Sequence, residues 1–315
     1  MFRRIFSIFN FQFSIIFIAL LVTSCEKVVE FDIDDSDRYI VVNALPCTDS
    51  LVFANITYSR FFLDNQAFPP VSDATVILDV NGVPYPSTGR DGANYLFAYH
   101  AVAGDLLTIH VQVPGRDSIV ASTRVPALPD MQPPLAEIDT LMPFNTGEIT
   151  FTLNDPDGRN YYYIYISERD SGIKWNRWEE KWDTIDTVST AYFNCVNLEI
   201  TDPSVNSIEG MMNYFNSLLF TDSLIDQQQY EVKLSLMMLK DTAENPLLRE
   251  YSLVVESLSP DAFRYTKEVL SSQGMGAYFA EPRHIYGNLS GGALGIFAGI
   301  ARRQYPLTFK YKATP

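Results

Sequence analysis

The 315-residue sequence has few of the side chains from which metal sites and hydrolytic centres are built. It contains only 3 His and 3 Cys, and no His has the spacing to another His or Cys that a zinc site uses. No Ser lies in the Gly-x-Ser-x-Gly pattern of a nucleophile elbow, and no pair of carboxylates is distinct from the acidic background. We therefore predict a protein that is not an enzyme and that holds no metal or cofactor, with a hydrolase as the weakest alternative.

Basic residues are scarce as well. The chain has 23 Lys and Arg against 38 Asp and Glu, which gives a net charge of −15 at pH 7. Because a field of this sign repels nucleic acid and anionic lipid surfaces, both are excluded as partners. Hydrophobic residues make up 47% of the chain, which excludes a disordered protein.

The N-terminus has the pattern of a bacterial lipoprotein signal peptide. Arg3 and Arg4 precede an apolar run over residues 5–22, and small residues then lead to Cys25. A transmembrane anchor is the weaker alternative, because the run is barely long enough to span a bilayer and no basic cluster follows it. We predict that residues 1–24 are removed and that a lipid on Cys25 anchors the chain to a membrane.

Residues 25–38 are expected to form an acidic tether. A charge run here is commonly a solvated spacer, but an acidic tract behind the lipid cysteine also directs some lipoproteins to the cell surface. The face of the membrane therefore stays undecided. Beyond the tether, Cys47 and Cys195 either pair or remain separate thiols, and separate thiols are favoured because two cysteines make a weak framework.

Residues 39–126 have the pattern of an antiparallel β-sandwich. Residues 75–80 lead into Asn81-Gly82, the strongest short hairpin signal, and residues 107–113 alternate apolar with polar side chains. Short strands with turn signals and no helical period predict an immunoglobulin-like or transthyretin-like domain.

Residues 127–134 are rich in proline and predict a stiff linker, followed by a second β-sandwich domain over residues 135–315. One inserted α-helix is expected there, because Ser259 is a good N-cap and Gly274 a good end. A weaker helical pattern covers residues 208–219. The predicted fold class is thus all-β and mainly antiparallel. Strands of the second domain are expected over residues 148–153, 161–167, 187–194, 230–238, 247–257 and 306–312.

Seven segments follow one another in an order that is specific, although each segment alone is a loose pattern. They are residues 71–76, 91–95, 106–129, 219–225, 258–263, 281–282 and 288–297. Their layout resembles that of the Bacteroidota lipoprotein family known only as domain of unknown function 4249. This resemblance implies an outer-membrane location near TonB-dependent transporters, and it supplies no catalytic residues.

All 3 Trp of the protein lie among charged residues in one short segment. Trp175, Trp178 and Trp182 fall between two expected strands. Aromatic faces flanked by charged groups suit sugar rings or the surface of a partner protein. Alternatively, and more often, such rings pack back onto their own domain.

Two loop motifs invite a ligand-binding interpretation. Residues 154–158, Asn-Asp-Pro-Asp-Gly, gather oxygen ligands as calcium loops do, but the later bidentate Glu is absent. Residues 291–295 are glycine-rich like a phosphate loop, but the Lys-Ser/Thr that should follow is absent. We interpret the first motif as a turn and the second as a segment that needs the backbone freedom of glycine.

A tripeptide of Asp, then Ser or Thr, then a small or apolar residue recurs along the chain. It resembles the acceptor pattern for O-glycosylation of exported proteins in this bacterial group, although Asp and Ser or Thr also collect at turns. Modification is expected first at exposed sites, and the best candidates are Thr140, just beyond the proline-rich linker, and Thr184 or Thr187, which follow the three Trp residues.

The leading hypothesis is a non-enzymatic outer-membrane lipoprotein that binds an outer-membrane protein, such as a TonB-dependent transporter, or helps it to capture cargo. The alternative is a surface glycan-binding protein that uses the three Trp side chains.

Replacing Cys25 with Ala is expected to release the protein from membranes or to trap its uncleaved precursor, because acylation supplies the attachment. Membrane fractionation and intact-mass spectrometry measure both outcomes. Cys47→Ala, which lies outside the signal, should leave the attachment unchanged. A cleaved Cys25→Ala protein that stays in the membrane would contradict the lipoprotein assignment.

Overall fold

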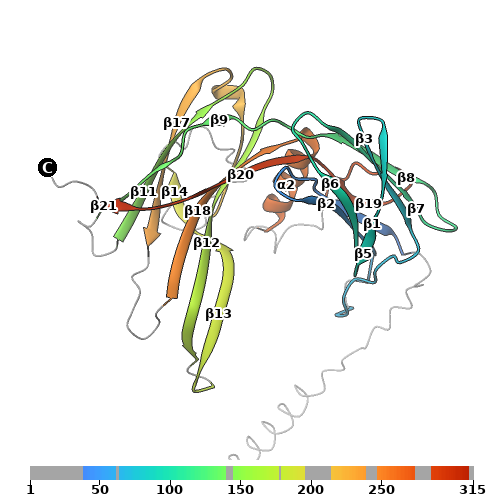
Figure 1. The fold of residues 1–315 in the computed structure, drawn as a ribbon, viewed down its shortest axis with the longest axis horizontal. Helices are drawn as coiled ribbons and strands as arrows, with labels where there is room; N and C mark the ends of the chain where they lie inside the picture. The colour runs from blue at the N-terminus through green and yellow to red at the C-terminus, as the bar shows by residue number, and fades with distance from the viewer. Residues whose placement is uncertain are drawn as a thin grey trace, which may run out of the picture. The chain divides into compact units, whose positions relative to one another are not determined.

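A computed structural model describes residues 38–61, 64–139, 145–176, 179–195, 214–238, 247–273 and 285–311. Residues from Tyr39 onward form one compact unit. The described chain is mostly β-strand with mainly antiparallel sheets, so the predicted all-β class is confirmed (Figure 1). No helix in the described part is long and apolar enough to cross a membrane.

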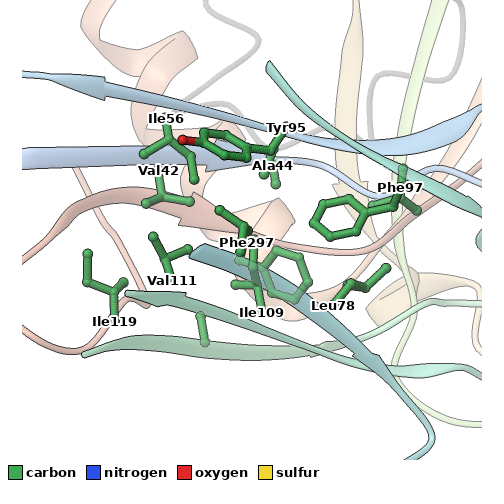
Figure 2. Packing of buried hydrophobic residues seen from close by; sticks show 14 of the residues in the cluster. Val42, Ala44, Ile56, Leu78, Tyr95, Phe97, Ile109, Val111, Ile119 and Phe297 are labelled. Carbon is green, nitrogen blue, oxygen red and sulfur yellow. The ribbon is translucent and has the colours of Figure 1, made fainter. Parts of the chain in front are cut away.

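The N-terminal half of the unit is a sandwich of two sheets, with strand orders β19-β1-β2-β6-β5 and β4-β3-β7-β8. Apolar side chains alternate along the strands and meet between the sheets, where Val42, Tyr95 and Ile109 lie in one cluster (Figure 2). The predicted hairpin at Asn81-Gly82 is confirmed, because both residues have positive φ, 52° and 87°, as a two-residue turn requires. The strands are β1 (Ile40–Ala44), β2 (Leu51–Tyr58), β3 (Thr75–Val80), β4 (Val83–Pro86), β5 (Gly89–Asp91), β6 (Asn94–His100), β7 (Leu106–Gln112) and β8 (Ile119–Arg124).

Two further sheets enclose a second core. One has the order β13-β12-β18-β20 with β16 on β12, and the other has the order β15-β14-β17-β11-β10-β21 with β9 on β11. Ile164 and Leu253 from the first sheet share this core with Phe151 and Leu234 from the second. The strands are β9 (Asp130–Met131), β10 (Leu135–Asp139), β11 (Asn145–Asn154), β12 (Tyr161–Asn176), β13 (Lys181–Thr190), β14 (Phe193–Cys195), β15 (Tyr214–Phe215), β16 (Leu218–Thr221), β17 (Gln229–Met238) and β18 (Leu247–Leu258).

The predicted helix is α2 (Pro260–Gln273). Its N-cap is confirmed, because the Ser259 hydroxyl accepts a hydrogen bond from the Ala262 amide at 3.3 Å. Phe263 packs its ring 4.7 Å from that of Tyr161, and together they help to form a third apolar cluster. The weaker helical prediction over residues 208–219 is wrong at its described end, because that stretch lies in β15 and β16, where hydrogen bonds to β14 and β12 hold it extended.

The C-terminal segment contributes a strand to three of the four described sheets. β19 (Leu294–Phe297) pairs in parallel with β1, β20 (Ile300–Pro306) pairs antiparallel with β18, and β21 (Lys310–Tyr311) pairs in parallel with β10. Phe297 is fully buried in the core of the first sandwich (Figure 2). The predicted linker at residues 127–134 therefore does not separate the strands of the two sandwiches, because a strand from the C-terminal segment completes the first sandwich.

An ion pair between Arg302 and the buried Glu256 stabilises the C-terminal segment beside the third cluster. Glu256 is only 4% exposed and lies opposite Arg302, whose Nε donates to its carboxylate at 2.7 Å. Burial raises the pKa of Glu256, while the nearby Arg302 opposes the rise. Arg302 also lies 3.4 Å from Asp49, and its amide donates to the Thr48 hydroxyl at 3.1 Å. These contacts join strand β20 to the loop that follows β1.

The glycine-rich residues 291–295 act through their backbone, as the sequence indicates. Gly295 has φ of 108°, and a Cβ placed there would lie 2.1 Å from the Val42 carbonyl oxygen. Gly291 has φ of 67°, and its Cβ would lie 2.6 Å from the Ser118 oxygen. Only glycine lets the segment approach β1 and β8 this closely.

Replacing Gly295 with Ala is expected to destabilise the protein by about 3 kcal/mol or more, because strain at positive φ adds to a backbone clash. Gly89→Ala is the matched control, because Gly89 lies in strand β5 and a Cβ at this position would meet nothing within 4 Å. It should cost less than about 1 kcal/mol. Chemical denaturation measures both, and equal stability of the two variants would contradict the role given to Gly295.

Candidate functional site

The hairpin formed by β12 and β13 is the candidate site. The two strands pair without a register shift from Ser167–Thr190 to Asn176–Lys181. β18 pairs with β12 only as far as Gly172, so the hairpin end extends beyond its described neighbour (Figure 1). The predicted strand over residues 161–167 thus continues much further than expected.

Trp175 and Trp182 lie directly opposite each other across this hairpin. Their ring centroids are 5.5 Å apart in an edge-to-face arrangement of 63°, a favourable geometry for aromatic pairs. They remain 38% and 51% exposed. Packing onto their own domain, the alternative interpretation, therefore covers them only in part. Trp178 lies outside the described residues.

The Trp pair belongs to a larger apolar surface on one face of the sheet. Cross-strand partners share a face, and the register places Arg169 with Val188, Ile173 with Thr184 and Ser171 with Leu248 on the Trp side. These apolar side chains lie among Arg169, Ser171, Thr184 and Asp186, and contact surfaces between proteins have such a mixed composition. We call it the Trp face; its exposed apolar members are Ile173, Trp175, Trp182, Val188 and Leu248.

Charged side chains of the hairpin form ion pairs on both of its faces. Arg169 donates two hydrogen bonds to Asp186, at 2.8 and 2.9 Å, and these bonds lower the pKa of Asp186. On the other face, Arg249 lies 2.6 Å from both Glu168 and Asp170. Contacts made by this surface therefore depend more on its apolar side chains than on free charge.

The predicted glycosylation residues Thr184 and Thr187 are both exposed in strand β13. They lie on opposite faces, Thr184 on the Trp face and Thr187 on the other. The structure places both residues in a strand rather than in a turn. Thr140 lies outside the described residues, and the modification stays a prediction.

Three carboxylates from the turns after β11 and β16 meet elsewhere in the unit. Asp155, Asp222 and Asp226 each offer an oxygen within 4.8 Å of the others, and the first two are buried. Asp155 belongs to the Asn-Asp-Pro-Asp-Gly motif, whereas no sequence signal singles out the other two, which lie far along the chain. Oxygen ligands of this kind could hold a hard cation.

The buried carboxylates already serve as acceptors. The Tyr162 hydroxyl and the Gln227 amide, at 3.1 Å, both donate to Asp155, and the Asn160 amide donates to Asp222 at 2.5 Å. Burial and the charges of the neighbouring carboxylates raise the pKa of Asp155. These bonds fix the two turns to each other, which agrees with the structural interpretation of the motif.

The remaining candidate side chains are dispersed. Cys47 and Cys195 are both buried and neither forms a disulfide, so separate thiols are confirmed. Burial and the Asp49 side chain raise the pKa of Cys47 to about 11, which disfavours the reactive thiolate. His100 and His110 are exposed on different strands, β6 and β7.

Replacing Asp226 with Asn is expected to stabilise the protein by about 0.5 kcal/mol at pH 7, because it removes a like charge beside Asp155. Because the pKa of Asp155 is raised in the folded state, folding favours the protonated carboxyl group. This contribution to stability is full below the pKa of the unfolded state and is lost as pH rises through the pKa of the folded state. The gain should therefore vanish near pH 3. Thermal unfolding with and without calcium measures it. Calcium stabilisation that the variant loses would instead identify a cation site.

One of the three comparisons with known proteins identifies a family, and none gives an activity. Among solved structures, the Enterococcus faecalis MSCRAMM ACE, described as binding its ligands by the collagen Hug model, is 10% identical, and the match covers 88% of this chain and 96% of that chain. Its TM-score of 0.23 is too low to support any conclusion. No curated protein matches. The model of the domain of unknown function DUF4249 matches residues 26–305, and the chain belongs to this family.

Proposed function

We propose that this chain is a non-enzymatic outer-membrane lipoprotein that binds a partner protein through the Trp face. The observation that carries the proposal is the exposed Trp175–Trp182 pair at the end of a long hairpin. Trp side chains are the most enriched at the energetic centre of protein interfaces. The signal pattern ending at Cys25 supports the lipid anchor, and the family resemblance supports an outer-membrane transporter as the partner.

The hairpin suits this role because it is rigid at its base and accessible at its end. β12 is paired on both sides, with β13 and β16 on one and β18 on the other. The Trp rings pack on each other, so little side-chain freedom is lost when a partner covers them.

Glycan binding is the second candidate, and one observation favours it. Thr184 and Asp186 are exposed and follow Trp182 on the Trp face, at intervals of two residues along β13. Hydroxyl and carboxylate groups on the same face as an aromatic pair provide both the stacking surface and the hydrogen-bonding groups that a sugar ring needs.

Replacing both Trp175 and Trp182 with Ala is expected to weaken partner binding at least about 30-fold, which corresponds to the loss of a hot spot. The matched control replaces Phe53 and Leu96 with Ala, because these residues are also directly opposite, exposed and apolar, on β2 and β6. Tagged full-length protein is recovered from detergent-solubilised outer membranes of the native host. A stoichiometric partner should copurify with the wild type and the control only.

Recovery of no stoichiometric partner by the wild type would contradict the proposal. A glycan array tests the second candidate in parallel. Glycan binding that is lost in the double Trp variant but kept in the control would favour a surface glycan-binding protein.

A further inference from the structure

Strand β13 forms the outer edge of its sheet. It pairs with β12 along its whole length, and no strand in the described part of the chain pairs with its other side. Its ten residues are exposed or half-buried on both faces. Among the described residues, therefore, no strand pairs with the N–H and C=O groups on this side of β13.

Edge strands are usually protected against pairing, and β13 lacks two of the common protections, a Pro and a β-bulge, although it retains charged side chains at Lys181, Asp183 and Asp186. It contains no Pro and no Gly, and its ladder with β12 shows no bulge. Lys181 is its only basic residue, and it lies at one end, paired with Glu179 and Asp183. Trp, Ile, Val and Thr, which favour strands, make up most of the rest.

We propose that β13 pairs antiparallel with β13 of a second copy of this chain, about a two-fold axis through Ile185. The two four-stranded paths then form one continuous sheet, with both Trp faces on the same side. The inference concerns the strand edge and does not depend on the proposed function of the Trp face.

The sequence of β13 is self-complementary in this register. Trp182 lies opposite Val188 of the second copy, so the strand's two most exposed apolar side chains cover each other, being 51% and 71% exposed in the single chain. Asp183 lies opposite Thr187, and Asp186 lies opposite Thr184. No like charges meet directly.

Other two-fold registers are less favourable. An axis through Asp183 or Asp186 places that carboxylate directly opposite its own copy, which is destabilising. An axis through Thr184 places Trp182 opposite Asp186. The axis at Ile185 avoids both arrangements, and it also overlaps nearly the full length of the strand.

The net charge of the chain opposes association, but it acts weakly at this contact. The two Asp186 carboxylates become diagonal neighbours, and each is already held by the Arg169 of its own chain at 2.8 Å. Charges elsewhere on the body are screened beyond about 8 Å at physiological salt.

Two variants with the same added charge test the pairing. Ile185→Lys would place two ammonium groups opposite each other, whereas Thr184→Lys would place each opposite Asp186 of the second copy. Sedimentation of the full-length lipidated protein in detergent should show a dimer for the wild type and for Thr184→Lys. The dissociation constant of Ile185→Lys should rise at least tenfold. Cooperative unfolding of each variant verifies that it is folded.

Cysteine cross-linking provides the independent test. Ile185→Cys should form an interchain disulfide on mild oxidation, because directly opposite residues have Cβ atoms about 5 Å apart. Ser189→Cys, which would lie opposite Lys181, should not. Three outcomes would overturn the proposal: a monomeric wild type, equal weakening of the dimer by both Lys variants, or equal cross-linking at both Cys positions. Equal weakening by the Lys variants would also indicate that an unrelated partner strand binds this edge.

Discussion

The structure depends on how closely the C-terminal segment approaches the backbone of the N-terminal strands. At Gly295 the chain passes β1 at a distance that admits no side chain. Three residues later the Ala298 amide donates to Ala44, and the Ile300 amide donates to Pro46 at 2.8 Å. This single contact line places Phe297 in one apolar core and Ile300 in another. A side chain at position 295 would push the C-terminal segment away from β1 and so disturb both apolar cores.

The same segment also determines how firmly the hairpin is held. β20 pairs with β18 over seven residues, and β18 in turn pairs with β12, the strand that carries Trp175. Glu256 and Arg302 lie opposite each other in the pairing of β18 with β20, so their ion pair stabilises the sheet at the base of the hairpin. The exposed end can therefore present its aromatic pair in a fixed geometry although no described strand supports it there. Rigidity at a distance from the body is what a contact surface on a hairpin requires.

The sequence predicts local elements well and long-range pairing poorly. Alternation along residues 107–113, the Asn81-Gly82 turn and the Ser259 cap depend on neighbouring residues, and the structure contains all three. The strand predicted over residues 161–167 is too short, because Asp170 and Gly172, which follow it, disfavour strands and interrupt the apolar pattern. The charges of Arg169 and Asp170 are neutralised by Asp186 and Arg249, which are remote in sequence, so the strand continues.

The candidate sites divide in the same way. The three Trp residues are conspicuous in composition, so the region of the Trp face is evident from the sequence, whereas its other members depend on cross-strand register. Asp222 and Asp226 join Asp155 only because separate turns meet in space, and no local pattern contains that information. The return of β19 to β1 is unpredictable for the same reason.

The pairing of β1 with β19 also affects the order in which the protein can fold. Val42 and Gly295 are neighbours in the sheet, yet almost the whole chain is synthesised between them. The first sandwich to leave the ribosome therefore lacks a strand and a core phenylalanine until the last residues arrive. Contacts between such distant residues slow folding and keep the nascent chain open for longer. For a protein exported as we propose, the chain must cross a membrane before it folds. A core that is completed only by the C-terminal segment delays folding until the whole chain is available.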